Sequence, residues 1–273
     1  LHTFYFRSGK KCCCTVICEH SSFYWIVSRW ADENGFERKR NFMIQISNLS
    51  KKYGETVVFS DLNYTFENAC IYGLVGRNGA GKTTLLNILS NYDKNYTGVI
   101  SIDRKKMNKV DYLDMPVAYA MDQPSFFNEL TIYENLLLIA SSRKIKKQEA
   151  FDKIERILDG LGLKKYENYS PLELSKGTMQ RLNNACAMIQ EEKITIFDEP
   201  FSGLDPVQMK LLENVIVEFH KKEKGIYIIS SHDIECLQNV CDKCLLLHNG
   251  QIREINMEEV DREEIAKILS EGE

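Results

Sequence analysis

The stretch Ile71–Leu86, which reads Ile-Tyr-Gly-Leu-Val-Gly-Arg-Asn-Gly-Ala-Gly-Lys-Thr-Thr-Leu-Leu, predicts how the rest of the chain is organised. The apolar run from Ile71 to Val75 has the length and composition of a buried strand. It is followed by a glycine-rich loop and the apolar start of a helix, in the order of the P-loop pattern G-x-x-x-x-G-K-[ST]. Glycines let such a loop approach a triphosphate closely, and the helix N-terminus adds its positive dipole end. The sequence therefore predicts a nucleoside triphosphate site.

Two side chains of this loop have specific expected roles. Lys82 is expected to reach the β- and γ-phosphates, and the hydroxyl of Thr83 is expected to ligate Mg²⁺. The other residues expected to contact the triphosphate are Gly76, Arg77, Asn78, Gly79, Ala80, Gly81 and Thr84. The alternative is a glycine-rich turn without a ligand, but the strand, the Lys-Thr pair and the helix all occur in the order that the pattern requires.

Length, composition and charge are those of an ordinary globular protein. The chain has 273 residues, enough for one large domain or two small ones. Its net charge of −4 divides into +3 over residues 1–42 and −7 over residues 43–273, so no nucleic-acid partner is expected. No stretch approaches the roughly 18 consecutive apolar residues of a membrane span. If the protein works at a membrane, we expect another chain to supply the spanning part.

The nine cysteines are unevenly distributed, and four of them lie within residues 1–42. The remaining cysteines belong to a segment that needs cytosolic ATP, where thiols stay reduced, so we expect structural thiols. Cys241-x-x-Cys244 could instead form a redox pair or half of a metal site. No second pair accompanies it in the sequence.

Residues 1–42 form an atypical tail that has three interpretations. The apolar run Cys12–Cys18 is broken at once by Glu19, which does not fit a signal peptide. The second interpretation is a zinc site, because the residue types that ligate zinc occur at Cys12, Cys14, Cys18 and His20, although their spacing matches no recognisable zinc motif. The third hypothesis is translated upstream sequence, because residues 37–40 can be encoded by purine-only codons, as in a ribosome-binding site, shortly before Met43. Intact-mass analysis of the native protein would test it.

Apolar periodicity predicts strands and helices on both sides of the loop. Residues 51–54 are expected to form a turn, followed by a hairpin-like pair at 56–59 and 62–66. Helices are expected from Thr131, as an N-cap, to Ser141 and over Lys146–Leu161. An all-helical insert at about residues 124–170 thus separates two halves of an α/β domain. The other expected strands are Met43–Leu49, Thr97–Asp103, Val117–Met121 and Ile226–Ser230.

Three further motifs occur in order after the predicted insert. Leu174–Arg181 reads Leu-Ser-Lys-Gly-Thr-Met-Gln-Arg, and Ser175 is a plausible helix cap. Ile194–Pro200 reads Ile-Thr-Ile-Phe-Asp-Glu-Pro, which predicts a buried strand that ends in two carboxylates. Ser202–Asp205 reads Ser-Gly-Leu-Asp, and His232 follows the strand that is expected at 226–230.

Together with the phosphate loop, these motifs resemble those of the ATP-binding-cassette (ABC) family, specifically the single-cassette type of bacterial exporters. The resemblance covers about residues 43–250. The family signature is usually written Leu-Ser-Gly-Gly-Gln followed by Gln-Arg. The matching residues are Ser175, Gly177, Gln180 and Arg181, whereas Lys176 and Thr178 depart from it. Lys176 places an extra positive charge beside the expected γ-phosphate position.

The resemblance implies a role for each candidate site residue. Tyr53 would stack on the adenine base. Asp198 would hold Mg²⁺, and Glu199 would polarise the attacking water. Gln123 would contact both the Mg²⁺ and the water, and His232 would contact the γ-phosphate. Three residues would bind the ATP that a partner subunit holds: Ser175, Gly177 and Asp205.

For the whole molecule, the resemblance implies a P-loop NTPase (RecA-like) α/β core with an N-terminal antiparallel β-subdomain and an inserted α-helical subdomain. This domain would span residues 43–255, with a C-terminal helical tail at 256–273. The implied cofactors are ATP and Mg²⁺. The implied partners are a second cassette, identical or a paralogue, and a membrane-spanning permease on a separate chain, at the cytoplasmic face of the membrane. The protein would energise transport, and export in particular; the alternative is a soluble ABC ATPase, such as one for iron–sulfur assembly.

Overall fold

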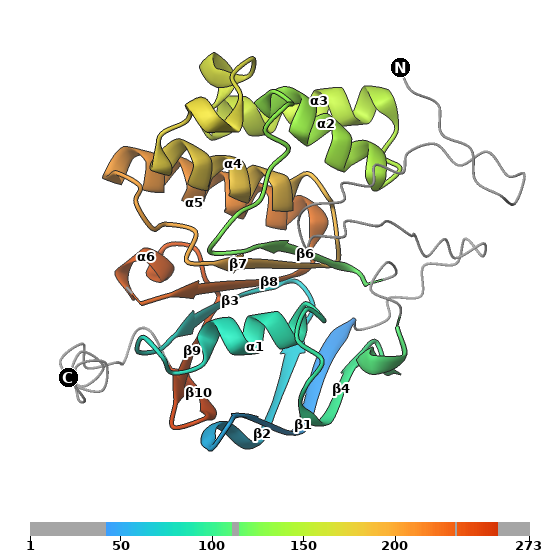
Figure 1. Ribbon diagram of the computed structural model, residues 1–273, viewed down its shortest axis with the longest axis vertical. Coiled ribbons are helices and arrows are strands. Elements are labelled where there is room, and N and C mark those ends of the chain that lie inside the picture. The colour runs from blue at the N-terminus through green and yellow to red at the C-terminus, as the bar shows by residue number, and fades with distance from the viewer. Residues whose placement is uncertain (1–41, 111–114, 233, 256–273) are drawn as a thin grey trace, which may run out of the picture.

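The computed structural model describes residues 42–110, 115–232 and 234–255 (Figure 1). The interpretations of residues 1–41 and the helical tail expected at 256–273 lie outside the described residues. Within the described ranges, no helix is long and apolar enough to cross a membrane.

A central six-stranded sheet with the strand order β10-β9-β3-β8-β7-β6 carries the phosphate loop. All its neighbouring strands are parallel except β10, which runs antiparallel to β9. Parallel strands covered on both faces are apolar throughout, and every residue of β3, β7 and β8 is buried. The strand bounds are β3 Cys70–Val75, β6 Val117–Ala120, β7 Ile194–Asp198, β8 Ile226–Ser231, β9 Lys243–His248 and β10 Gln251–Ile255.

A second, antiparallel sheet has the strand order β2-β1-β4-β5, as expected for the N-terminal subdomain. Its strands are β1 Met43–Tyr53, β2 Thr56–Glu67, β4 Thr97–Ile102 and β5 Lys105–Lys106.

Two local predictions in this sheet are wrong. The predicted turn at residues 51–54 is mostly strand, because Lys51 and Tyr53 pair with Phe59 and Thr56 across the sheet. The predicted hairpin at 56–59 and 62–66 is one continuous strand. Asp61 has a left-handed backbone (φ 51°) that interrupts β2 without ending it. Pairing with β1 on both sides of Asp61 overrides the local turn tendency of Ser-Asp.

The helices begin and end close to the predicted positions. Thr131 caps the helix that begins at Ile132, in a capping box with Glu134. The second insert helix ends at Gly160, and Gly162 follows it with a left-handed φ of 62°. The helices are α1 Lys82–Leu89, α2 Ile132–Ser142, α3 Lys147–Gly160, α4 Lys176–Met188, α5 Pro206–Glu223 and α6 Glu235–Gln238, with 3₁₀ turns at Met107–Lys109, Lys164–Tyr166 and Pro171–Glu173.

Two apolar cores lie on opposite faces of the central sheet. One core joins the central sheet to the antiparallel sheet through the apolar side of α1. The other joins the central sheet to helices α2 to α5. Along β7 the side chains alternate between them, with Ile194 and Ile196 in the first core and Phe197 in the second. Figure 1 shows α1 between the two sheets and α2 with α3 beyond α4. This is the α/β class that the sequence predicts.

Candidate functional site

The phosphate loop connects β3 to α1 and packs against β2. Gly81 has a left-handed φ of 100°, and a Cβ atom there would lie 2.6 Å from Cγ1 of Val58. Only glycine therefore fits this backbone against β2. Asn78 and Gly79, at the tip of the loop, are exposed. The loop thus has a fixed base and an open rim.

Lys82 lies beneath this loop and connects it to the end of β7. Its side chain is 7% exposed, and Nζ donates to the Gly76 carbonyl at 2.7 Å. Nζ also lies 3.7 Å from Oε1 of Glu199. The ammonium group therefore stands between the loop backbone and a carboxylate that is far away in the sequence. Thr83 is exposed and Thr84 is partly exposed at the start of α1.

Asp198 ends β7 as a buried carboxylate with several hydroxyl donors. Its Oδ1 accepts from Ser230 Oγ at 2.6 Å, and its Oδ2 lies 3.4 Å from the hydroxyl of Tyr119. Burial raises the pKa of Asp198, and hydrogen bonds from Ser230 and Thr83 oppose that shift, whereas the nearby Glu199 carboxylate adds to it. The sheet register places Asp198 beside Ser230.

Glu199 follows in a left-handed conformation, with φ of 50°. Its backbone N–H donates to Ser230 Oγ at 2.9 Å. Its Oε2 lies 2.9 Å from Nδ1 of His232, while Oε1 faces Lys82. Two groups predicted separately, Glu199 and His232, therefore meet in the structure. The His232 side chain is 62% exposed, which leaves its other ring nitrogen open to the surface.

Sequence analysis missed two residues of this cluster, Ser230 and Tyr119. The Tyr119 hydroxyl lies 3.0 Å from Oδ1 of Asn87 as well as 3.4 Å from Asp198. Burial and the Asp198 charge raise the pKa of Tyr119, so it remains a hydroxyl donor. The signal that could have identified them is a polar side chain within an otherwise apolar strand, as at Tyr119 in β6 and at Ser230 in β8.

The signature segment forms the N-terminus of α4. Ser175 caps this helix, because its Oγ accepts from the backbone N–H of Thr178 at 3.3 Å. A Cβ at Gly177 would lie 2.9 Å from the carbonyl oxygen of Gly203, so glycine lets α4 approach the Ser202–Asp205 loop. Gln180 then donates to the carbonyl of Glu199 at 3.3 Å. The signature helix is thus connected to the loop of Glu199.

The remaining predicted residues do not join this cluster. Asp205 caps α5 by accepting from the N–H of Gln208 at 2.9 Å. Gln123 is exposed, three residues beyond β6. Tyr53, at the end of β1, is 53% exposed, and the ammonium of Lys51 lies 4.5 Å from its ring centre. Among the described residues, no hydrogen bond or ion pair joins Ser175, Gly177 or Asp205 to the phosphate loop of the same chain.

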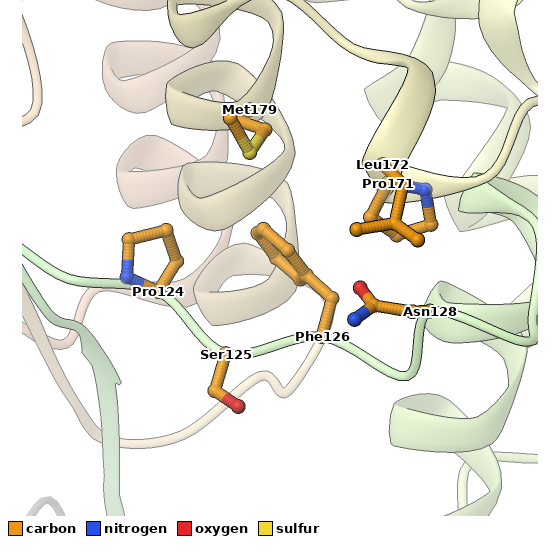
Figure 2. Close-up of a pocket in the computed structure, with 7 residues that line it drawn as sticks. All are labelled: Pro124, Ser125, Phe126, Asn128, Pro171, Leu172 and Met179. Atoms are coloured by element: carbon orange, nitrogen blue, oxygen red, sulfur yellow. The ribbon is translucent and has the colours of Figure 1, made fainter.

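An apolar groove of about 280 Å³ lies next to Gln123. Figure 2 shows the Phe126 ring between the segment that contains Pro171 and Met179 of α4. The groove is held together by Ser170, whose Oγ donates to the Asn128 carbonyl at 2.8 Å. Its lining residues are Pro124, Ser125, Phe126, Asn128, Pro171, Leu172 and Met179.

The Cys241-x-x-Cys244 pair has the properties of buried thiols. Both are free in the structure, and burial raises the pKa of Cys244 to about 12 and that of Cys241 well above its usual value. Within the described ranges, no group of three or more histidine, cysteine or acidic side chains could hold a metal ion.

Residues 59–202 match the family model of the ABC transporter. The chain belongs to this family. It is 30% identical over 223 residues to the bacitracin transport ATP-binding protein of Enterococcus faecalis, covering 81% of this chain and 71% of that protein. It is also 30% identical over 211 residues to the tungstate uptake system ATP-binding protein of Peptoclostridium acidaminophilum, covering 77% and 97%.

Solved structures of ABC cassettes share the fold. The solved ATP-binding subunit of an ABC transporter superimposes with a TM-score of 0.72 at 26% identity, covering 84% of this chain and 95% of that one. The cassette architecture predicted from the sequence is therefore confirmed. The ABC family is one of ATP-binding, ATP-hydrolysing subunits, and this chain is an ABC transporter ATP-binding protein.

Proposed function

We propose that this chain hydrolyses ATP to drive export through a membrane-spanning permease on a separate chain, at the cytoplasmic face of the membrane. The observation that carries the proposal is the convergence of Asp198, Glu199 and His232, at the ends of neighbouring strands, on Lys82 at the start of α1. A cation, a carboxylate proposed to ligate the metal and a proposed base thus lie around one phosphate loop.

The phosphate loop holds the triphosphate in this proposal. Backbone N–H groups of residues 76–81 and the ammonium of Lys82 face the β- and γ-phosphates. Arg77, Asn78 and Ala80 form the rim of the loop, and Thr83 with Thr84 begins the helix behind it. Tyr53 receives the adenine on the ring face that Lys51 leaves open.

The donors at the end of β7 fit Mg²⁺. The hydroxyl of Thr83 and the carboxylate of Asp198 are hard oxygen ligands, and the Thr83 hydroxyl is one of the groups that lower the pKa of Asp198. Bound Mg²⁺ would neutralise charge that develops on the phosphates. Tyr119 and Ser230 hold Asp198 in place by donating to its carboxylate. Gln123, which is exposed three residues beyond β6, would complete the set.

Glu199 orients the attacking water in this scheme. Its carboxylate is held between Lys82 at 3.7 Å and His232 at 2.9 Å, beside the phosphate loop. His232 in turn contacts the γ-phosphate through its exposed ring edge. Positioning of this kind supplies most of the catalysis in phosphoryl transfer.

A second cassette completes the site. The N-terminus of α4 offers an anion-binding end, yet Ser175 and Gly177 make no hydrogen bond to the phosphate loop of their own chain. Pairing of two cassettes head to tail supplies them, together with Asp205, to the ATP of the partner. A two-fold axis uses the same surfaces twice.

The groove beside Gln123 is the proposed contact with the permease. Leu172 is 75% exposed at its edge, and exposed apolar surface of this kind marks interaction sites. The groove is formed by the segment after Gln123 and by the insert. A change at the nucleotide can therefore reach the permease through these two segments.

The proposed direction of transport, export rather than import, rests on the signature and on a stretch of the helical insert. Lys176-Gly177 and the stretch from Asn128 to Leu136 resemble cassettes that power bacterial exporters, including those for drugs and antimicrobial peptides. The name of the bacitracin relative states transport without a direction, and the tungstate relative is an uptake protein. Both relatives are transport proteins, which favours transport over iron–sulfur assembly.

The test is a pull-down of the tagged full chain from detergent-solubilised membranes of its source cells, read by mass spectrometry. We expect a multi-spanning membrane protein, and its own sequence would narrow the substrate. Recovery of soluble partners alone would contradict the transport proposal and leave the ATPase assignment in place.

A further inference from the structure

The side chain of Ser175, which caps α4, contacts a buried residue, Thr178, that departs from the family signature. Thr178 is 3% exposed, and its Oγ1 lies 2.9 Å from Ser175 Oγ. Behind it, the guanidinium of Arg181 donates to Thr178 Oγ1 at 3.3 Å. Three polar groups thus form a chain from the interior to the surface.

Arg181 is a buried cation with neutral acceptors. It is 5% exposed, and it donates to the carbonyl oxygens of Leu161 at 2.6 Å and Gly162 at 3.3 Å, at the end of α3. Among the described residues, no carboxylate lies within ion-pair distance of it. Its positive charge therefore acts on Thr178 without a direct ion pair to neutralise it, and it repels the hydroxyl proton of Thr178.

The direction of the Ser175–Thr178 hydrogen bond follows from counting donors. A threonine hydroxyl has one proton and two lone pairs. If Ser175 donated to Thr178, the Thr178 proton would need another acceptor inside the protein, and none is present among the described residues. An unmade hydrogen bond in a buried position is costly. Thr178 therefore donates to Ser175.

Ser175 is left with one free group. Its oxygen accepts from the Thr178 hydroxyl and from the Thr178 backbone N–H, so both lone pairs are occupied. Its own proton must then point away from the helix, and Ser175 is exposed. Because the proton has no competing acceptor on this side, the hydroxyl is ready to donate to an anion.

We propose that Thr178 is a positioning residue that fixes the Ser175 hydroxyl as a hydrogen-bond donor toward the γ-phosphate of ATP held by the partner cassette. This inference rests on the proposed function. Preorganised donors lose less free energy on binding than donors that must first reorient. The departure at Thr178 therefore strengthens the signature rather than weakening it.

The experiment measures ATP-dependent pairing by analytical ultracentrifugation, in full-length Glu199→Gln protein, in which slow hydrolysis lets the paired state accumulate. Thr178→Val keeps the shape and removes the hydroxyl, whereas Thr178→Ser keeps the hydroxyl. We expect Thr178→Val to raise the ATP concentration for half-maximal pairing roughly tenfold, the equivalent of one hydrogen bond. Thr178→Ser should stay within about twofold.

A double-mutant cycle separates positioning from general support of the fold. If Thr178 acts through the hydroxyl of Ser175, Thr178→Val has no further effect in a Ser175→Ala background. An equal loss in both backgrounds would overturn the inference. Should Thr178→Val not fold, Thr178→Cys replaces it under the same criterion, because a thiol is only a weak donor.

The outcomes distinguish the two proposals. If Glu199→Gln protein with the native signature does not pair with ATP, the proposed pairing itself is wrong, and this inference falls with it. If it pairs but the cycle is additive, only the role of Thr178 is wrong. Fluorescent ATP binding to the unpaired copy should be equal in all Thr178 variants, because that site uses the phosphate loop.

Discussion

Glu199 occupies its place because of a backbone conformation that a carboxylate rarely adopts. A left-handed φ costs a residue other than glycine about 1–2 kcal/mol, and here φ is 50°. The hydrogen bond from its N–H to Ser230 Oγ offsets part of that cost. The result is that Asp198 points inward while the next carboxylate turns outward toward Lys82 and His232. Two adjacent acids thereby have different tasks.

In its ionised form, Asp198 is expected to lower the free energy of unfolding of the protein without bound ATP and Mg²⁺. Burial raises its pKa, so the folded state prefers the protonated carboxyl, and stability is lost as the pH rises through the folded pKa. Asp198→Asn mimics the protonated form. We expect a higher Tm than wild type at pH 7 to 8, and a difference that vanishes near and below pH ~4, where unfolded aspartate is also protonated.

The control for this prediction is the same comparison with Mg²⁺ and ATP present, monitored by differential scanning calorimetry. Wild type should gain more stability from the ligands than Asp198→Asn, because the stabilisation by a ligand grows with the logarithm of its concentration divided by its Kd. A Tm below wild type at every pH would contradict the assigned cost of burial.

At the scale of elements, α3 is fixed to the core by a buried charge. Lys153 is 1% exposed, and its Nζ lies 2.6 Å from Glu191 and 3.3 Å from Glu223 at the end of α5. Tyr227 on β8 donates to the same Glu223 at 2.6 Å. One cation therefore ties a helix of the insert to the end of α5 and to the residues before β7.

Removing this cation should be strongly destabilising. Lys153→Met leaves the largely covered carboxylate of Glu223, 12% exposed, without its cation, and we expect a loss of about 3 kcal/mol in the free energy of unfolding. The measurement is urea denaturation followed by circular dichroism. Lys147→Met, at an exposed position of the same helix, is the matched control and should change stability by less than ~0.5 kcal/mol. Equal effects of the two variants would show that the buried network contributes nothing.

At the scale of the whole molecule, the two groups of proposed nucleotide-binding residues are not joined to each other within one chain. The phosphate loop and Glu199 occupy one edge of the central sheet, and Ser175 caps a helix without a hydrogen bond to that loop. This separation is the physical reason to expect an assembly. It also makes the assembly testable by mixing defective copies.

Mixing two inactive variants should restore hydrolysis. Lys82→Ala removes the phosphate-loop cation, and Ser175→Glu places a repelling charge at the signature while suiting the positive end of α4. Each variant alone should lose most hydrolysis. An equimolar mixture that exchanges freely should recover about a quarter of the wild-type rate, because half of the pairs contain one intact site of two. A phosphate-release assay measures it, and an absence of recovery would argue against pairing of identical copies.

Binding to the membrane partner should depend on the apolar groove. Leu172→Asp puts a charge on its most exposed apolar side chain, and we expect recovery of the permease in the pull-down to fall at least about fivefold. Val99→Asp, on β4 and 38% exposed, is the control and should recover normal amounts. Equal recovery with both variants would place the permease contact elsewhere, provided that ATP binding is unchanged in both.

Local patterns in the sequence determined most elements of this protein. The strand, glycine loop and helix around Lys82, and the capping box at Thr131, each depend on contacts between residues close in the chain. They could therefore be predicted one by one. The roles of Glu199 and His232 were each implied by the family resemblance. The two residues meet in the structure because both follow parallel strands whose carboxyl ends lie at one edge of the sheet.

Tertiary structure alone decided the rest, because those features depend on pairing between distant segments. Cross-strand pairing made β2 one continuous strand through Asp61. Sheet register brought Ser230 and Tyr119 onto Asp198, and helix packing buried Arg181 beneath Thr178. The hydrogen bonds that orient Ser175 and Asp198 come from partners whose positions no local pattern specifies. The sequence by itself determined which groups are available, and the fold determined which of them meet.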